Sequence, residues 1–130
     1  MANRRFRSQF RFGMEAMVVE LFANISIGAA GAPTLNQSAS KGVASVVRDS
    51  AGQYTITLQD KYNSLLHMNV LQDSGTSAPA APFVVLEAES VSSNKQLTIQ
   101  CRAVDNSTAT DPASGESMLV KITLSNSSVA

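Results

Sequence analysis

Few residues of this 130-residue chain have the types and spacings that suit catalysis or metal binding. Cys101 is the single cysteine and His67 the single histidine, and neither has a partner at the spacing of a nucleophile–base pair or a metal site. Cys101 alternates with Leu97, Ile99 and Ala103, which predicts a buried thiol that packs as a small hydrophobic side chain. His67 has the opposite parity to the apolar residues of its own predicted strand, so we expect it on the surface.

The acidic residues form no convincing catalytic or ion-binding set. Glu87 and Glu89 share one face of a predicted strand, but no further polar residues accompany them, so a solvent or partner face is favoured over acid–base chemistry. Asp105, Asp111 and Glu116 loosely suggest calcium, yet their spacing matches no ion-binding loop, which favours a plain connection. We therefore expect no enzymatic activity, no metal and no cofactor.

Two further ligand-binding classes are weakly supported. The sequence GAAGAP at 28–33 lacks the lysine and the following helix of a phosphate-binding loop, so it is interpreted as a turn. Carbohydrate-binding modules usually expose aromatic residues, and this chain has no Trp and only Tyr54 and Tyr62 besides its phenylalanines. A small carbohydrate-binding module or enzyme remains a remote alternative.

The clearest interaction motif is a basic and aromatic arm at residues 1–13. Its four arginines give the first twelve residues a charge of +4, while the remaining residues hold six Lys or Arg against ten Asp or Glu. In an extended conformation the phenylalanines and most of the arginines would lie on opposite sides, which suits a neighbouring protein. A solvated terminus and, less favoured, nucleic-acid binding are the alternatives. The predicted partner-binding residues are Arg4, Arg5, Phe6, Arg7, Phe10, Arg11 and Phe12.

Length and composition predict one β-domain at residues 14–130, after this arm in the sequence. The hydrophobic fraction of 44% is enough for one core, and charged residues, at 15%, fall below the usual quarter. A polar but weakly charged surface suits β-proteins that contact other proteins. No uncharged apolar run is long enough for a transmembrane helix, and charged residues interrupt the apolar stretch that a secretory signal needs, so no membrane association is expected.

Alternating polarity predicts about seven strands. Residues 41–58 form a hairpin in which Tyr54, Ile56 and Leu58 share one face, with a turn of three to five residues around Asp49–Gly52. Residues 14–28 also fit a helical stripe, but the longer alternating set favours a strand from about Val18 to Ile27. The other expected strands are Leu65–Leu71, Phe83–Val91, Lys95–Val104 and Met118–Leu124. The expected fold is all-β, a single β-sandwich or barrel of mostly antiparallel strands with an extended N-terminal arm.

The same alternation predicts which side chains are buried. In the strand at 65–71, Leu66, Met68 and Val70 fall on one side. The strand at 83–91 is apolar on both faces, and a domain this small cannot easily bury both, which predicts a homo-oligomer. The expected core includes Leu97, Ile99, Cys101, Val120, Ile122 and Leu124.

Three stretches carry a resemblance to small virion proteins of tailed bacteriophages. These are LFANISIGAAGAPTL, KGVASVVRDSAGQYTITLQDKYNSLL and DPASGESMLVKITLSNSSV, whose shared motifs fall at Gly28–Thr34, Lys41–Leu66 and Asp111–Val129. The resemblance is to proteins of the capsid decoration, or cement, type and covers most of residues 20–130. The motifs consist of turn residues and strand faces, so they specify a fold better than a task.

The resemblance implies a structural protein that binds the outer surface of a phage head and stabilises it. The expected partner is the major capsid protein, with copies of this chain as a second partner and a trimer favoured over a dimer. The expected location is the outer capsid surface of the virion, after synthesis in the cytoplasm of the bacterial host. A tail, fibre or head–tail adaptor component is the alternative.

Overall fold

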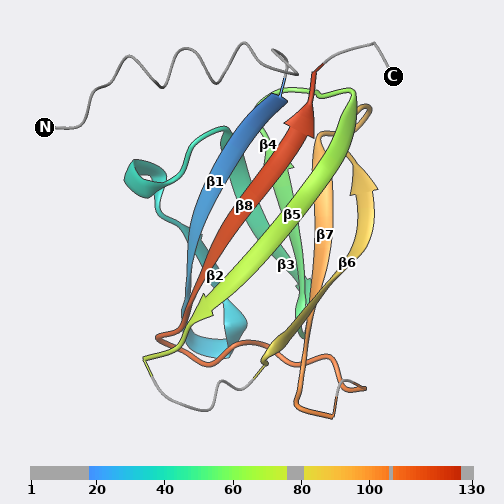
Figure 1. Cartoon of the computed structure of the whole chain (residues 1–130). Coiled ribbons are helices and arrows are strands. Elements are labelled where there is room, and N and C mark those ends of the chain that lie inside the picture. The colour runs from blue at the N-terminus through green and yellow to red at the C-terminus, as the bar shows by residue number, and fades with distance from the viewer. Residues whose placement is uncertain (1–17, 76–80, 106, 127–130) are drawn as a thin grey trace, which may run out of the picture.

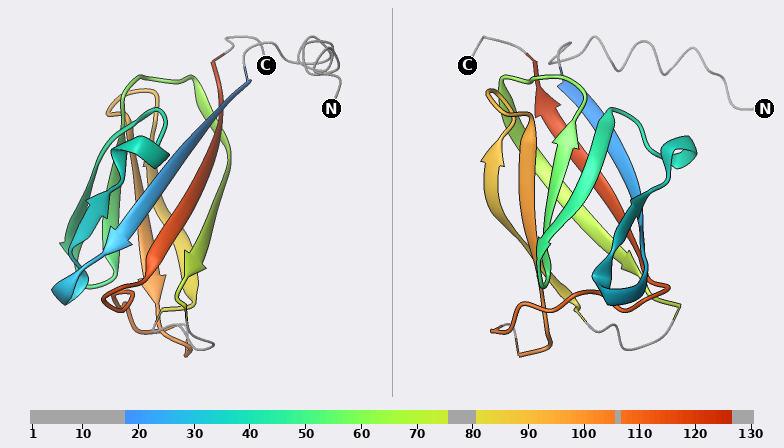
Figure 2. Two further views of the ribbon diagram at one scale, coloured as in Figure 1. Left: turned by 90° about the vertical axis from the view of Figure 1, so that its left-hand side faces the viewer. Right: turned by 180° about the vertical axis from the view of Figure 1, so that it is seen from behind.

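The computed structural model describes residues 18–75, 81–105 and 107–126, which form two four-stranded antiparallel sheets packed face to face (Figures 1 and 2). The first sheet has the order β2-β1-β8-β5 and the second the order β3-β4-β7-β6. The strands are β1 Val18–Ile27, β2 Pro33–Leu35, β3 Val43–Ser50, β4 Gln53–Leu58, β5 Ser64–Asp73, β6 Phe83–Ser90, β7 Gln96–Arg102 and β8 Ser117–Ser125. The predicted all-β fold is confirmed, and of the two expected architectures, sandwich or barrel, it is the sandwich.

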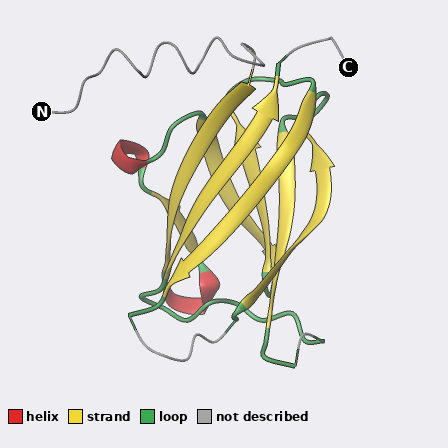
Figure 3. Ribbon diagram, viewed as in Figure 1, coloured by secondary structure: helices red, strands yellow, loops and turns green. Residues whose placement is uncertain are grey.

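The helical content of the described residues is limited to two short 3-10 turns, η1 at Ala29–Gly31 and η2 at Gln37–Ala39 (Figure 3). No helix in this part of the chain is long and apolar enough to cross a membrane. The ambiguous segment at 14–28 is a strand from Val18, because it pairs with β8 along nine consecutive positions. Tertiary pairing therefore decides between the helical and the extended pattern.

One apolar core fills the space between the sheets. All six residues expected in the core are buried, and Tyr54, Ile25 and Met118 are among the largest side chains that join them. In β4 the inward residues are fully buried and the outward ones half-buried, so the period of two matches the prediction from sequence.

Three expectations from the sequence are wrong in detail. The loop expected at 28–42 contains β2, which pairs with the end of β1 through Ile25 and Leu35 and gives an eighth strand. The hairpin turn is shorter than expected, because β3 continues to Ser50 and pairs there with Gln53. In β5 the ladder shifts between Leu65 and His67.

The shift in β5 reverses the predicted faces at the start of that strand. Leu65 is half-buried and packs against the core, whereas Leu66, expected to face inward with Met68 and Val70, is 53% exposed. A β-bulge adds one residue to a strand, so the residues before it change faces relative to those after it. Met68 and Val70 keep their predicted inward direction.

Candidate functional site

Segments from distant parts of the sequence meet at one end of the sandwich, around the carboxylate of Asp111. Arg48 in β3 binds it through two donors, with Nε 3.0 Å from Oδ1 and Nη2 2.8 Å from Oδ2. The backbone N–H of Gly52 donates to Oδ1 at 2.8 Å. The Tyr54 hydroxyl lies 2.9 Å from the same oxygen and 3.0 Å from the carbonyl oxygen of Gly31. These five residues, Gly31, Arg48, Gly52, Tyr54 and Asp111, are called the Asp111 cluster below.

The β3–β4 hairpin positions three members of this cluster. Arg48 pairs with Tyr54 across the two strands, so both side chains lie on the same face of the sheet. The ladder shifts between Arg48 and Ser50, and the turn that follows returns the chain at Gln53. The hairpin therefore presents a guanidinium, a hydroxyl and a backbone N–H toward the segment that joins β7 to β8.

Glycine is required at two of the five positions. Gly52 has φ +72°, and a Cβ there would lie 2.6 Å from the carbonyl oxygen of Cys101. Gly31 has φ +74°, and a Cβ there would clash with the side chain of Asp111. Positive φ and close approach together exclude ordinary side chains, so these two glycines let the hairpin turn and η1 approach the carboxylate.

The charges and hydrogen bonds of the cluster stabilise one protonation state. The hydrogen bond from Arg48 is the main cause that lowers the pKa of Asp111 from 3.8 to about 2, with further lowering by the Gly52 N–H and the Tyr54 hydroxyl. Burial, followed by the hydrogen bond to Asp111, raises the pKa of Tyr54. At neutral pH the cluster is thus an ionised carboxylate held by a guanidinium and a protonated phenol.

This arrangement holds together the β3–β4 turn, η1 and the segment that joins β7 to β8. The carboxylate of Asp111 accepts hydrogen bonds at both oxygens, and the side chains of Arg48 and Asp111 are 33% and 21% exposed. The other two acids of the loose calcium pattern make separate local hydrogen bonds. Asp105 Oδ1 accepts from the backbone N–H groups of Ser107 and Thr108, and Glu116 accepts from the Ala113 N–H. The described residues contain no group of three side chains that could hold a metal ion.

The other two candidate residues for catalysis, Cys101 and His67, lie where the sequence predicted them. Cys101 is fully buried as predicted, and burial is the main cause that raises the pKa of its thiol to about 12. Its Sγ lies 3.8 Å from Sδ of Met118. His67 is exposed in β5, as predicted. A protonated, buried thiol is a poor nucleophile.

Glu87 and Glu89 do not share a face as the sequence predicted. The β6 ladder shifts between Leu86 and Ala88, so Glu87 is the additional residue and Glu89 lies opposite Leu97. Glu87 accepts a hydrogen bond from the side chain of Gln53, and Glu89 accepts one from the Val91 N–H. The bulge separates the two carboxylates, so they form no acid–base pair.

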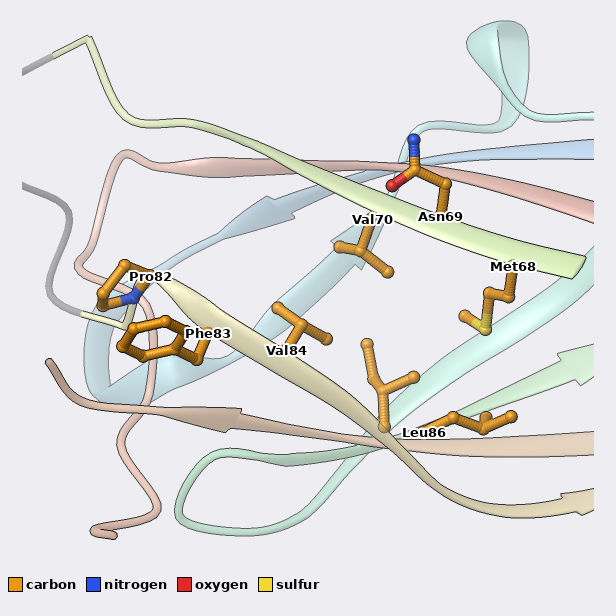
Figure 4. A pocket seen from close by; sticks show the side chains of 8 residues that line it. Met68, Asn69, Val70, Pro82, Phe83, Val84 and Leu86 are labelled. Atoms are coloured by element: carbon orange, nitrogen blue, oxygen red, sulfur yellow. The ribbon is translucent and has the colours of Figure 1, made fainter. Parts of the chain in front are cut away.

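A groove of about 340 Å³, bordered mainly by apolar residues, opens between β5 and β6, the strands at one edge of each sheet (Figure 4). Met68 and Val70 of β5 point toward β6 across the groove, as Figure 4 shows. Phe83 and Leu86 of β6 are 44% and 45% exposed beside it. The complete lining comprises Met68, Asn69, Val70, Pro82, Phe83, Val84, Leu86 and Ile99.

A second apolar surface lies on the outer face of the first sheet. Phe22, Leu71 and Leu119 are 43%, 61% and 39% exposed there. They border a shallow depression of about 390 Å³ together with Lys121, which forms an ion pair with Glu20 at 3.3 Å. Exposed apolar side chains that gather in this way are typical of protein contact surfaces.

The arm residues predicted to bind a partner, Arg4, Arg5, Phe6, Arg7, Phe10, Arg11 and Phe12, lie outside the described residues, and their role stays a prediction. Sequence reasoning missed the Asp111 cluster, because it treated residues 28–33 as a turn and Asp111 as part of a plain connection. A signal was present: the members of the cluster fall within the three stretches that carry the phage resemblance. Comparison of the chain with family models, curated proteins and solved structures gives no match.

Proposed function

We propose that this chain is a non-enzymatic structural protein of a virion, which binds the outer surface of a tailed-phage head and stabilises it. The observation that carries the proposal is that the polar cluster and the exposed apolar side chains lie in different places. The residues of the Asp111 cluster fall within the three stretches that resemble phage virion proteins, and the cluster holds loops together. Most of the large exposed apolar residues lie instead on β6 and on the strands of the first sheet, with Val47 and Val104 as exceptions.

This distribution supports a binding role. Exposed apolar side chains that lie together mark surfaces that bind other proteins. The virion assignment itself rests on the resemblance of the three stretches at Gly28–Thr34, Lys41–Leu66 and Asp111–Val129. The basic arm and the acidic remainder of the chain provide opposite charges for contacts with a capsid surface.

The direct test is binding to phage heads. Purified protein is mixed with heads that lack it, the heads are sedimented, and the copy number per particle is measured by quantitative mass spectrometry. We expect hundreds of copies per head. Six or twelve copies per virion, confined to the tail or neck, would favour the tail or adaptor alternative, and no association with any virion would contradict the proposal.

The contribution of the arm is tested with two matched variants. In one, Phe6, Phe10 and Phe12 are replaced by Ser; in the other, Arg4, Arg5, Arg7 and Arg11 are replaced by Gln. Exposed ion pairs contribute about 0–1 kcal/mol each, whereas buried aromatic side chains dominate binding energies, so the Phe variant should lose more occupancy. Equal occupancy of both variants and the unmodified chain would mean that other surfaces carry the contact.

A further inference from the structure

The free edge of β6 presents unpaired backbone groups next to exposed apolar side chains. The direction of its N–H and C=O groups follows from β7, its neighbour. Cys101 in β7 accepts from Thr110 and donates to Gly52, so both of its backbone groups point away from β6. Val84, which lies opposite Cys101, therefore has its own groups on the outer side of β6.

The same parity applies two residues further along. Backbone groups alternate in direction along a strand, so Ile99, two residues before Cys101, also directs its groups away from β6, and Leu86 lies opposite Ile99. Between them, Val85 pairs with Gln100 and uses its groups within the sheet. The edge of β6 therefore offers the N–H and C=O groups of Val84 and Leu86 to another strand.

The other three edge strands are less suited to adding a strand. β2 has only three residues, and the ladder of β3 is interrupted by two shifts. β5 pairs regularly with β8 from His67 to Asp73, but three of its four exposed positions there are polar, namely His67, Asn69 and Asp73. In β6 the four residues Phe83–Leu86 pair regularly with β7, and three of them are exposed apolar side chains.

We propose that β6 pairs with β6 of a second copy of this chain, antiparallel and about a two-fold axis at Val85. In this register Val84 of each copy exchanges hydrogen bonds with Leu86 of the other, and Val85 faces its own counterpart. The two copies then share a continuous eight-stranded sheet. This proposal concerns the chain in solution and does not depend on a role in virions.

The side chains in this register are complementary. Phe83 lies opposite Glu87 of the other copy, and Arg102 is the neighbour of Phe83 in β7, so a cationic and an anionic side chain approach across the contact. The apolar side chains of Val84 and Leu86 meet on the inner side, where they extend the lining of the β5–β6 groove. Pro82 precedes the strand and lacks an N–H, which ends the ladder.

Two-fold pairing also removes a hazard. An exposed apolar edge strand is a template for open-ended aggregation. An isologous contact uses the β6 edge of both copies at once, so the assembly ends at a dimer. The bulge at Glu87 ends the regular ladder of β6, which confines the hydrogen-bonded contact to Val84 and Leu86 and favours one register over its alternatives.

The register is tested by cysteine cross-linking of the full-length chain. Val85→Cys places two thiols in a non-hydrogen-bonded pair, where Cα atoms are about 4.5 Å apart, within the span of about 4.4–6.8 Å that a disulfide bridges. Native Cys101 is buried, so the unmodified chain gives the background level of cross-linking. Under mild oxidation we expect Val85→Cys to form a covalent dimer.

Two controls make the result specific. Val47→Cys, at a 53% exposed position on the opposite edge strand of the same sheet, should stay monomeric on a non-reducing gel. Phe83→Cys should also fail to cross-link to itself, because its predicted opposite is Glu87. Cross-linking of Val85→Cys no faster than that of Val47→Cys, or preferential linking of Phe83→Cys, would overturn the proposed register.

Light scattering tests the association without a covalent bond. A contact along one strand edge lies at the lower end of specific interfaces, so the measurement uses a concentration series that extends into the high micromolar range. We expect a monomer–dimer equilibrium that Leu86→Lys abolishes and Val47→Lys leaves unchanged, with the far-ultraviolet circular dichroism of both variants intact. A monomer throughout the series, or a trimer that Leu86→Lys leaves intact, would refute β6 pairing.

Discussion

Replacing Asp111 by Asn should reveal how much the Asp111 cluster stabilises the fold. The substitution keeps an oxygen that can accept from the Gly52 N–H and the Tyr54 hydroxyl, but it removes the charge that binds Arg48. The lowering of the pKa of Asp111 from 3.8 to about 2 measures the preference of the folded state for the ionised form. At about 1.4 kcal/mol for each pKa unit the lowering corresponds to about 2.5 kcal/mol, and because Arg48 and Asp111 are partly exposed to solvent, the expected loss at neutral pH is about 2 kcal/mol.

The same shift fixes the pH dependence. The pKa of Asp111 is lower in the folded chain than in the unfolded chain, so its contribution is complete above about pH 5 and is lost as the pH falls through 4 toward 2. Urea unfolding of the unmodified chain should therefore show a decline of about 2 kcal/mol over that range from this group. In the Asp111→Asn variant that part of the decline should be absent.

Glu20→Gln is the matched control. It also removes one carboxylate that binds a cation, but Glu20 and Lys121 are 50% and 47% exposed at 3.3 Å, so the expected loss is about 0–1 kcal/mol. A loss below about half a kcal/mol in Asp111→Asn, or an unchanged acid limb of its stability profile, would refute the assigned role of the cluster.

Three other predictions concern the core and the turns. Ile99→Ala, at a position that is 1% exposed, should lower the free energy of unfolding by about 2–5 kcal/mol in chemical denaturation. Cys101, with a thiol pKa raised by burial to about 12, should resist thiol reagents in native buffer at pH 8 and react fully in denaturant; rapid native labelling would contradict its burial. Gly52→Ala should destabilise more than Gly75→Ala, because both positions have positive φ but only Gly52 has atoms within contact distance of an added Cβ. Equal losses in the two glycine variants would mean that backbone strain alone decides.

The sequence by itself determined the class of fold and the central core. In β4 and β7 the inward and outward residues alternate without interruption, as Tyr54, Ile56, Leu97 and Ile99 show, and all four are buried. A period of two is a local property, since each residue points to the face opposite its neighbour's. It can therefore be read from the chain without knowledge of its partners.

Local periodicity failed wherever an extra residue entered a ladder. The shift in β5 brings Leu65 to the core and leaves Leu66 exposed, and the shift in β6 places Glu87 and Glu89 on different faces. A bulge depends on how two strands align, and no residue type in either strand predicts it. The short strand β2 was missed for a similar reason, because three residues carry no measurable period.

Only the tertiary structure decided which polar residues meet. Arg48 and Asp111 are 63 positions apart, and their contact depends on the β3–β4 hairpin and the β7–β8 connection reaching the same end of the sandwich. The edge position of β6 is equally a product of topology, since its sequence is as apolar as that of a central strand. Sequence patterns fix which face a side chain takes within a strand, whereas the order of strands and the packing of sheets fix its neighbours.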